Sequence, residues 1–197
     1  MIGILLAAGF SRRFGAPNKL LEALPGGFPI ALASAKRLVE AIPLSIAVVR
    51  PENKALADLL KEAGLKVFFC SEQDTEMADS LSAAIKFSAA FAESSDGFII
   101  ALADMPYIDS QTIAAIATKL NEGASIVVPT YQGKRGHPVG FSGKLRGELA
   151  SLQGDEGARS ILKRYPEEVI FLECNDSGIL ADIDTPADLD TPKNTVL

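Results

Sequence analysis

Short apolar, strand-like runs alternate along this chain with segments whose apolar residues recur at helical spacing. The strand-like runs cover residues 3–6, 45–49, 66–70, 97–102, 125–129, 169–172 and 178–183, and the helical patterns cover 29–42, 52–63, 79–92 and 110–121. Because right-handed crossovers join strands that alternate with helices, this order predicts an α/β fold with a mainly parallel sheet and helices on both faces. The runs are continuously apolar, which is typical of strands covered on both sides.

Capping residues predict where several of these helices begin and end. Gly64 follows the second helical pattern as a C′ glycine, and Gly123 ends the fourth. Asp109 is the expected N-cap of the fourth helix, and Asp79 or Ser80 that of the third.

The regular alternation of strand-like and helical segments ends at residue 130. A polar, glycine-rich turn at 131–138 is followed by a short strand-like run at 139–141 and by helical patterns at 144–152 and 156–164. We interpret 130–165 as an elaboration beside the active site within one domain of residues 1–190, and 191–197 as a tail that frays. A chain of 197 residues is long enough to bury a core of its own.

Composition and charge exclude several classes of protein. An apolar content of 48% argues against disorder, and no apolar run approaches the roughly 20 residues that a membrane span needs. No basic leader precedes the first strand, so we expect a cytoplasmic protein without a membrane partner. The net charge of −6 disfavours nucleic acid as a partner.

Cys70 and Cys174 are expected to be reduced thiols, and the single histidine, His137, argues against a histidine-based metal site.

The first strand-like run ends in a loop of small residues that carries fixed positive charge. Ala7, Ala8 and Gly9 allow backbone amides to approach an anion closely. Arg12 or Arg13, together with Lys19, can neutralise phosphate charge. The loop matches neither the P-loop nor the dinucleotide-binding fingerprint. It is therefore either a polyphosphate-binding loop or a surface loop that happens to contain these residues.

Acidic residues follow two other apolar runs. Asp104 comes after 97–102, where an unpartnered carboxylate costs desolvation and where Mg²⁺ bridging phosphate oxygens is a natural partner. Asp182 and Asp184 share one face of an extended segment, and one of them could complete the metal site. The alternatives are that Asp104 caps a turn, and that Asp184 or Thr185 caps a short helix. Ligands of parallel sheets bind beyond the carboxyl ends of the strands, so we expect these segments to meet there.

Two polar turns are open to either interpretation. Gly154 to Arg159 carries charges of both signs before a helical pattern, and Gly136-His137-Pro138 offers an imidazole that is neutral near pH 7. Each turn is either a solvated turn or a substrate contact.

Six segments, in order along nearly the whole chain, resemble nucleotidyltransferases of the MobA/MocA type. They are Leu6-Ala7-Ala8-Gly9-x-Ser11-x-Arg13-x-Gly15 with Asn18-Lys19-Leu20-Leu21; Met77-Ala78-Asp79-Ser80-Leu81; Ala103-Asp104-Met105-Pro106; Gly133-Lys134-Arg135-Gly136-His137-Pro138; Gly154-Asp155-x-Gly157-Ala158-Arg159; and Asp182-Ile183-Asp184-Thr185-Pro186. One such motif is weak, whereas six in sequence are specific.

The resemblance implies a three-layer, Rossmann-like domain of the glycosyltransferase-A type that transfers a nucleoside monophosphate from a nucleoside triphosphate. It implies that Arg13, Lys19 and Asp104 are catalytic and that Mg²⁺ is held by Asp104 with Asp182 or Asp184. The implied nucleotide-binding residues are Leu6, Ala7, Ala8, Gly9, Ser11, Arg12, Arg13, Lys19, Ser80, Leu81 and Asp104, and the acceptor-binding residues are Gly136, His137, Pro138, Asp155 and Arg159.

The form Ala7-Ala8-Gly9 resembles the cytidylyltransferase branch, which makes molybdopterin cytosine dinucleotide. This implies CTP as the donor, a molybdopterin-type acceptor and release of pyrophosphate, and it allows a molybdoenzyme as partner. Glu76 departs from the glycine that the family often has there, and it leaves the base preference open. The alternatives are a nucleotidyltransferase acting on a sugar phosphate or other phosphorylated small molecule, and a non-catalytic nucleotide-binding partner of a molybdoenzyme.

Overall fold

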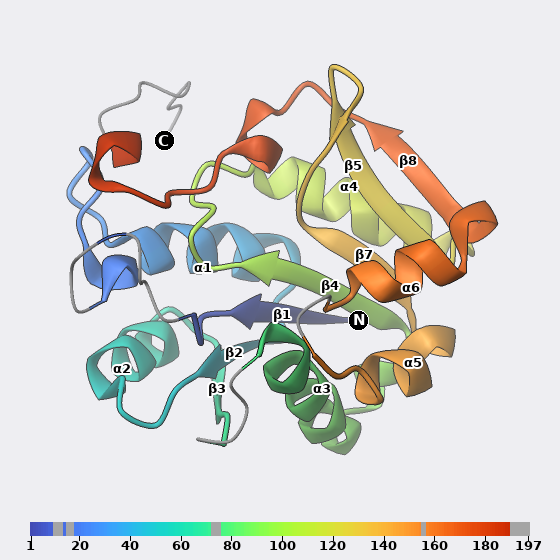
Figure 1. Ribbon diagram of the computed structural model, residues 1–197, viewed down its shortest axis with the longest axis horizontal. Coiled ribbons are helices and arrows are strands. Elements are labelled where there is room, and N and C mark those ends of the chain that lie inside the picture. Colours follow the sequence, from blue (N-terminus) through green and yellow to red (C-terminus); the bar gives the residue numbers. More distant parts are fainter. Residues whose placement is uncertain (10–13, 15–17, 72–75, 155–156, 190–197) are drawn as a thin grey trace.

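A sheet of eight strands forms the centre of the molecule in the part of the chain that the structure describes (Figure 1). This structure is a computed structural model, and it describes residues 1–9, 14, 18–71, 76–154 and 157–189. The strand order is β3-β2-β1-β4-β7-β5-β6, with β8 beside β5. The strands are β1 Ile2–Leu6, β2 Ser45–Val49, β3 Lys66–Phe69, β4 Gly97–Leu102, β5 Ile126–Tyr131, β6 Lys134–Arg135, β7 Val139–Ser142 and β8 Val169–Glu173.

Most strand pairs are parallel, as the alternation of strands and helices predicts. β1 pairs in parallel with β2 and β4, β2 with β3, and β5 with β8. The antiparallel strand β7 lies between β4 and β5, and β6 pairs antiparallel with β5. The elaboration therefore returns a strand into the middle of the sheet, because β7 follows β5 through the β6 turn.

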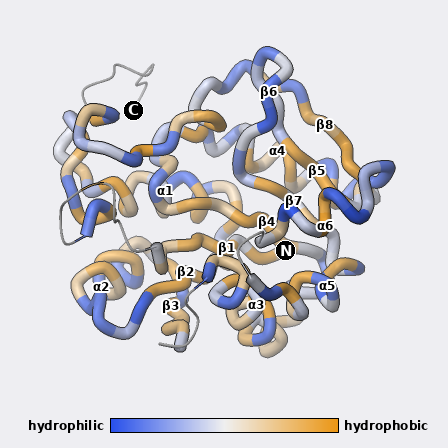
Figure 2. Tube along the Cα trace, in the orientation of Figure 1, coloured by the Kyte–Doolittle hydropathy of each residue, from blue (hydrophilic) through white to orange (hydrophobic). Residues whose placement is uncertain are grey.

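Helices cover both faces of the sheet, which confirms the three-layer expectation (Figure 1). One apolar core lies between the sheet and α1 (Ile30–Ala41), α2 (Lys54–Glu62) and α4 (Ser110–Asn121). The other lies under α3 (Met77–Phe87), α5 (Arg146–Ala150) and α6 (Arg159–Arg164). Apolar residues run through the central strand β1, as Figure 2 shows. Among the described residues, no helix is long and apolar enough to cross a membrane.

The segment 178–183, expected to be a strand, is instead a 3-10 turn at Ser177–Leu180 followed by irregular chain. The Asp176 side chain caps this turn by accepting the Gly178 N–H at 2.8 Å. A Cβ on Gly178 would lie 2.1 Å from the Tyr107 carbonyl oxygen, so the turn packs closely against that loop. Ile183 N–H then donates to Asp104 O at 2.9 Å, and the chain crosses the carboxyl ends of the strands rather than joining the sheet.

Helix boundaries match the predicted caps in some places and not in others. Asp109 caps α4 by accepting the Gln111 N–H at 2.9 Å, and Gly64 has the positive φ of a C′ glycine, +97°. Neither Asp79 nor Ser80 caps α3, because the helix begins at Met77. The pattern that predicted a helix to residue 92 continues past Phe87 only as 3-10 turns at Ser88–Ala90 and Ala92–Ser95. The tail 191–197 lies outside the described residues.

Candidate active site

The carboxyl ends of β1 and β4 lie side by side, with Leu6 in register with Leu102. The backbone ladder continues just past both strands, since Ala7 N–H donates to Val48 O at 3.0 Å and Ala103 N–H donates to Leu6 O at 3.1 Å. The Ser34 hydroxyl of α1 also donates to Ala103 O, at 2.9 Å. The two loops that leave these strands therefore start from fixed positions.

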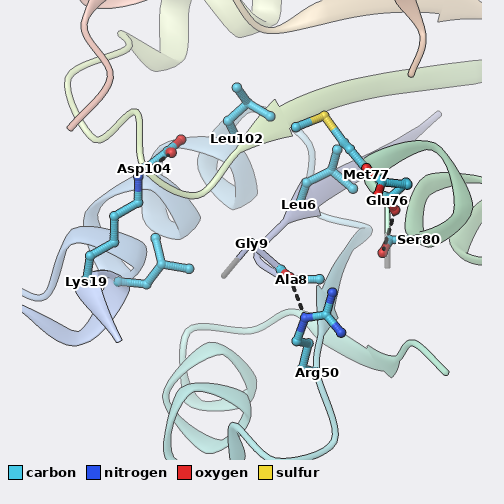
Figure 3. A pocket seen from close by; sticks show the side chains of 11 residues that line it. Leu6, Ala8, Gly9, Lys19, Arg50, Glu76, Met77, Ser80, Leu102 and Asp104 are labelled. Atoms are coloured by element: carbon cyan, nitrogen blue, oxygen red, sulfur yellow. Dashed lines mark hydrogen bonds and ion pairs between the residues drawn. The ribbon is translucent and has the colours of Figure 1, made fainter. Parts of the chain in front are cut away.

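Lys19 connects these loops to the C-terminal segment. It opens a 3-10 turn at Lys19–Leu21, which Asn18 caps by accepting the Leu20 N–H at 3.1 Å. Its ammonium Nζ donates to Asp104 Oδ2 at 2.9 Å, to Ile183 O at 2.8 Å and to Asp184 Oδ1 at 3.2 Å. Figure 3 shows the Lys19 side chain pointing to Asp104.

The surroundings of Lys19 keep its ammonium charged. The side chain is only 11% exposed, and this burial lowers its pKa. The hydrogen bonds and charges of Asp104 and Asp184 raise the pKa by more, so the net shift is upward from the ordinary value. A cation that is charged at neutral pH thus lies at the carboxyl ends of the strands, where ligands of parallel sheets bind.

Asp184, rather than Asp182, meets Lys19. Asp182 is exposed, whereas the intervening Ile183 is fully buried in the core. The sequence analysis offered Asp184 or Thr185 as the cap of a short helix, but the structure shows the cap on another side chain. The Asp188 carboxylate accepts the N–H groups of Asp184 and Thr185, at 3.1 and 2.7 Å, and so caps the turn Pro186–Leu189 from its third position.

Asp104 and Asp184 present the oxygen chemistry that Mg²⁺ prefers, and they already hold one cation, the Lys19 ammonium. Across residues 1–9, 14, 18–71, 76–154 and 157–189, no group of three or more histidine, cysteine, aspartate or glutamate residues could hold a metal. Mg²⁺ usually takes one or two protein carboxylates and completes its shell with phosphate oxygens and water, and the carboxylates of Asp104 and Asp184 fit that ligand set.

A cavity of about 140 Å³ adjoins Lys19 and Asp104 (Figure 3). It brings together six of the residues expected to bind nucleotide and adds five others. Its lining is Leu6, Ala8, Gly9, Lys19, Leu20, Arg50, Glu76, Met77, Ser80, Leu102 and Asp104.

Two expected nucleotide contacts lie elsewhere, and three cannot be placed. Ala7 is a core residue whose N–H bonds to Val48, so this amide is not available to an anion. Leu81 is buried beside a neighbouring apolar cavity. Ser11, Arg12 and Arg13 lie outside the described residues.

Arg50 is a site residue that the sequence analysis missed. It is 5% exposed, and its Nε donates to Ala8 O at 2.8 Å across the floor of the cavity (Figure 3). The sequence signal was a charged residue directly after the fully buried strand β2, which neighbours β1. Glu76, which the sequence marked only as a departure, lines the same cavity.

A second, apolar cavity of about 220 Å³ shares Leu6, Met77 and Leu102 with the first. His137 and Arg159, both expected at the acceptor site, line it. Pro138 is buried and is not among its lining residues, and Asp155 lies outside the described residues.

Gly136 and His137 are held against the C-terminal segment. A Cβ on Gly136 would lie 2.4 Å from Ile179 O, and the His137 N–H donates to that same oxygen at 3.0 Å. Burial lowers the pKa of His137, the Arg159 charge lowers it further, and the charges of Asp104 and Asp182 oppose this only in part. The imidazole is therefore neutral near pH 7, and its buried Nδ1 has no hydrogen-bond partner among the described residues.

Several known proteins are similar to this chain in sequence and fold. The family described as MobA-like NTP transferase domain matches residues 3–169. The purine catabolism protein PucB of Bacillus subtilis is 32% identical, with 96% of this chain and 94% of PucB covered. Nicotine blue oxidoreductase of Paenarthrobacter nicotinovorans is 26% identical, with 93% and 91% covered. The structure of Rv0371c from Mycobacterium tuberculosis in complex with manganese has a TM-score of 0.73 and 25% identity, with 95% and 94% covered.

Proposed function

Because the chain belongs to the MobA-like NTP transferase family of nucleotidyltransferases, we propose that it transfers CMP from CTP to a molybdopterin-type acceptor and releases pyrophosphate. The observation that carries this proposal is the Lys19 ammonium between Asp104 and Asp184, at the edge of a cavity formed by Ala8 and Gly9. Oxygen donors and a buried cation beside a small-residue loop suit a metal-bound triphosphate.

Asp104 and Asp184 are the proposed ligands of Mg²⁺, which supplies Lewis-acid polarisation and charge neutralisation when it is bound. Rv0371c, a structural relative, has been solved in complex with manganese, which supports use of a divalent ion by this chain. The donor oxygens come from the exit of β4 and from the segment after Ile183, so both are fixed by the fold.

The chemistry that remains for the protein is positioning and charge stabilisation. An oxygen of the acceptor phosphate attacks the α-phosphorus in line, the bond from the α-phosphorus to the bridging oxygen breaks, and pyrophosphate leaves with that electron pair. Lys19, charged at neutral pH, stabilises the charge that grows on the phosphoryl oxygens. We assign the same role to Arg13 and phosphate contacts to Ser11 and Arg12. No covalent intermediate with the protein is needed.

The two neighbouring cavities, which share three lining residues, suit the two substrates. The cavity with Ala8, Gly9, Arg50 and Ser80 adjoins Lys19 and would take the nucleotide. The apolar cavity with His137 and Arg159 would take the acceptor, with its phosphate toward Asp104. The preference for CTP rests on the Ala7-Ala8-Gly9 form of the first loop.

Release of pyrophosphate is the direct test. It should be measured with CTP, GTP and ATP, each with and without molybdopterin, in the presence and absence of Mg²⁺. We expect Mg²⁺-dependent release that requires molybdopterin and is fastest with CTP. Turnover only with sugar phosphates would reassign the acceptor, and nucleotide binding without turnover of any acceptor, together with capture of an apo-molybdoenzyme, would favour a non-catalytic partner.

A further inference from the structure

A third cavity, of about 420 Å³, shares His137 with the apolar cavity. Three of its lining side chains are cationic and, among the described residues, none is acidic, in a chain whose net charge is −6. The lining consists of Val128, Arg135, Gly136, His137, Val139, Arg159, Leu162, Lys163 and Pro166.

The fold builds this cationic wall from separate segments. Arg135 lies on β6, opposite Thr130 of β5, and its guanidinium stacks 4.5 Å from the centroid of the Phe171 ring on β8. Arg159 and Lys163 both lie on α6, four positions apart and therefore on one side of the helix. The positions of these charges are thus set by the sheet and by a helix.

The cationic cavity lies next to the site already described. It shares His137, Val139, Arg159 and Leu162 with the apolar cavity, which in turn shares three residues with the nucleotide cavity. A molecule that spans the three would meet the Lys19 and Asp104 end first, then an apolar middle, then the charges of Arg135 and Lys163.

We propose that the acceptor carries a second anionic group, remote from the phosphate that attacks, and that Arg135, Arg159 and Lys163 bind it. This rests on the proposed function for the identity of the acceptor but not for the existence of the anion site. His137 lines both cavities, and its Nδ1 is a buried atom with no hydrogen-bond partner among the described residues. The ligand group is an anion that accepts charge-assisted hydrogen bonds, and carboxylate and phosphate are suitable probes of the site because planar guanidinium groups pair with their oxygens.

The single histidine of the chain provides a direct readout, because the ring signals of His137 can be assigned without ambiguity in an NMR spectrum. The full-length protein, free of nucleotide and metal, should be titrated at fixed pH with inorganic phosphate and, separately, with acetate. We expect saturable shifts of the His137 ring signals, with binding weakened about tenfold in Arg135→Gln and in Lys163→Gln, as for loss of one charge-assisted hydrogen bond. Lys134→Gln, on the neighbouring residue of β6, is the matched control and should bind as the wild type does.

A kinetic arm tests the link to the acceptor. In the pyrophosphate assay, Arg135→Gln should raise the KM for the acceptor about tenfold and leave the KM for CTP unchanged. Absence of a saturable shift in the wild type, or equal binding in all variants, would overturn the anion site. If the shifts behave as expected and no acceptor is turned over, the anion site stands and the proposed function fails. If turnover occurs with an unchanged acceptor KM in Arg135→Gln, the acceptor does not use this site.

Discussion

The Lys19 ammonium lies 2.9 Å from the Asp104 carboxylate, a residue 85 positions further along the chain. The same ammonium reaches Ile183 O and Asp184, so one cation joins the first loop, the exit of β4 and the C-terminal segment. A backbone hydrogen bond from Ile183 N–H to Asp104 O also joins the C-terminal segment to the exit of β4. The ion cluster therefore serves both the geometry of the fold and the proposed chemistry.

Replacing Asp104 by asparagine tests the proposed metal site. The asparagine side chain would keep the size of the aspartate and one oxygen but lose the charge that holds a divalent ion. We expect turnover to fall by about 100-fold or more and binding of Mn²⁺ to weaken, while the far-UV circular dichroism stays unchanged. Asp58→Asn, an exposed carboxylate on α2, is the control and should behave as the wild type does. Mg²⁺-dependent activity near the wild-type level in Asp104→Asn would remove Asp104 from the site.

Lys19→Gln should lower both activity and stability, and the loss of stability should depend on pH. Because the pKa of Lys19 is raised in the folded state, its charge stabilises the fold fully below its unfolded value, near 10.5. This contribution is lost as the pH rises through the folded-state pKa. At pH 8, loss of the charged hydrogen bonds should cost about 1–3 kcal/mol of unfolding free energy.

Urea unfolding at pH values from 8 to above 10.5 checks this dependence. The difference in free energy between wild type and Lys19→Gln should be constant at first and then shrink in the most alkaline range. Lys86→Gln, at the exposed end of α3, should show no such difference. A gap that widens with pH would contradict a raised pKa.

The sheet could be predicted because the strand signal is local. Most of its strands are short apolar runs between helical patterns, and burial on both faces makes each run continuous. The position of β7 between β4 and β5 could not be predicted, because it depends on the path of the chain after the β6 turn. The run 178–183 is mostly apolar apart from Asp182, yet Asp176 caps a 3-10 turn there and Gly178 packs closely against Tyr107, so the segment does not join the sheet.

Some residues of the candidate site could be predicted from the sequence, and others could not. Lys19 and Asp104 were expected at the site because they lie in the chain segments that follow β1 and β4, and the structure brings them together. The sequence left Asp182 and Asp184 as alternatives, and the structure places Asp184 beside Lys19. Arg50 follows β2 in the same way but lies outside every recognisable motif, so the pattern alone did not distinguish it from a surface arginine. Ala7 was assigned to the phosphate loop because of its size, whereas the sheet ladder uses its amide.

Arg50→Gln tests a positioning role for the buried arginine. Its Nε fixes the carbonyl of Ala8, and loss of this bond should let the nucleotide loop move. We expect the KM for CTP to rise about tenfold, whereas the KM for the acceptor should stay within about twofold. Lys54→Gln, an exposed residue at the start of α2, is the control. Equal rises in both KM values, or a loss of stability without any change in KM, would point to a purely structural role.

Gly136→Ala tests whether the close approach of two segments positions His137. The added Cβ would lie 2.4 Å from Ile179 O and within 2.7 Å of the Ile179 side chain. Relief of this clash requires the backbone at Ile179 to move, which costs folding free energy. We expect the unfolding free energy to fall by about 1–3 kcal/mol and the His137 ring signals to shift, because the His137 N–H bonds that same oxygen. Gly147→Ala, on α5 with open space around its Cβ, should instead leave stability equal or raise it by about 0.5–1 kcal/mol. Equal stability of Gly136→Ala and Gly147→Ala in urea unfolding would show that the chain around Ile179 accommodates the added Cβ. The close approach would then not position His137.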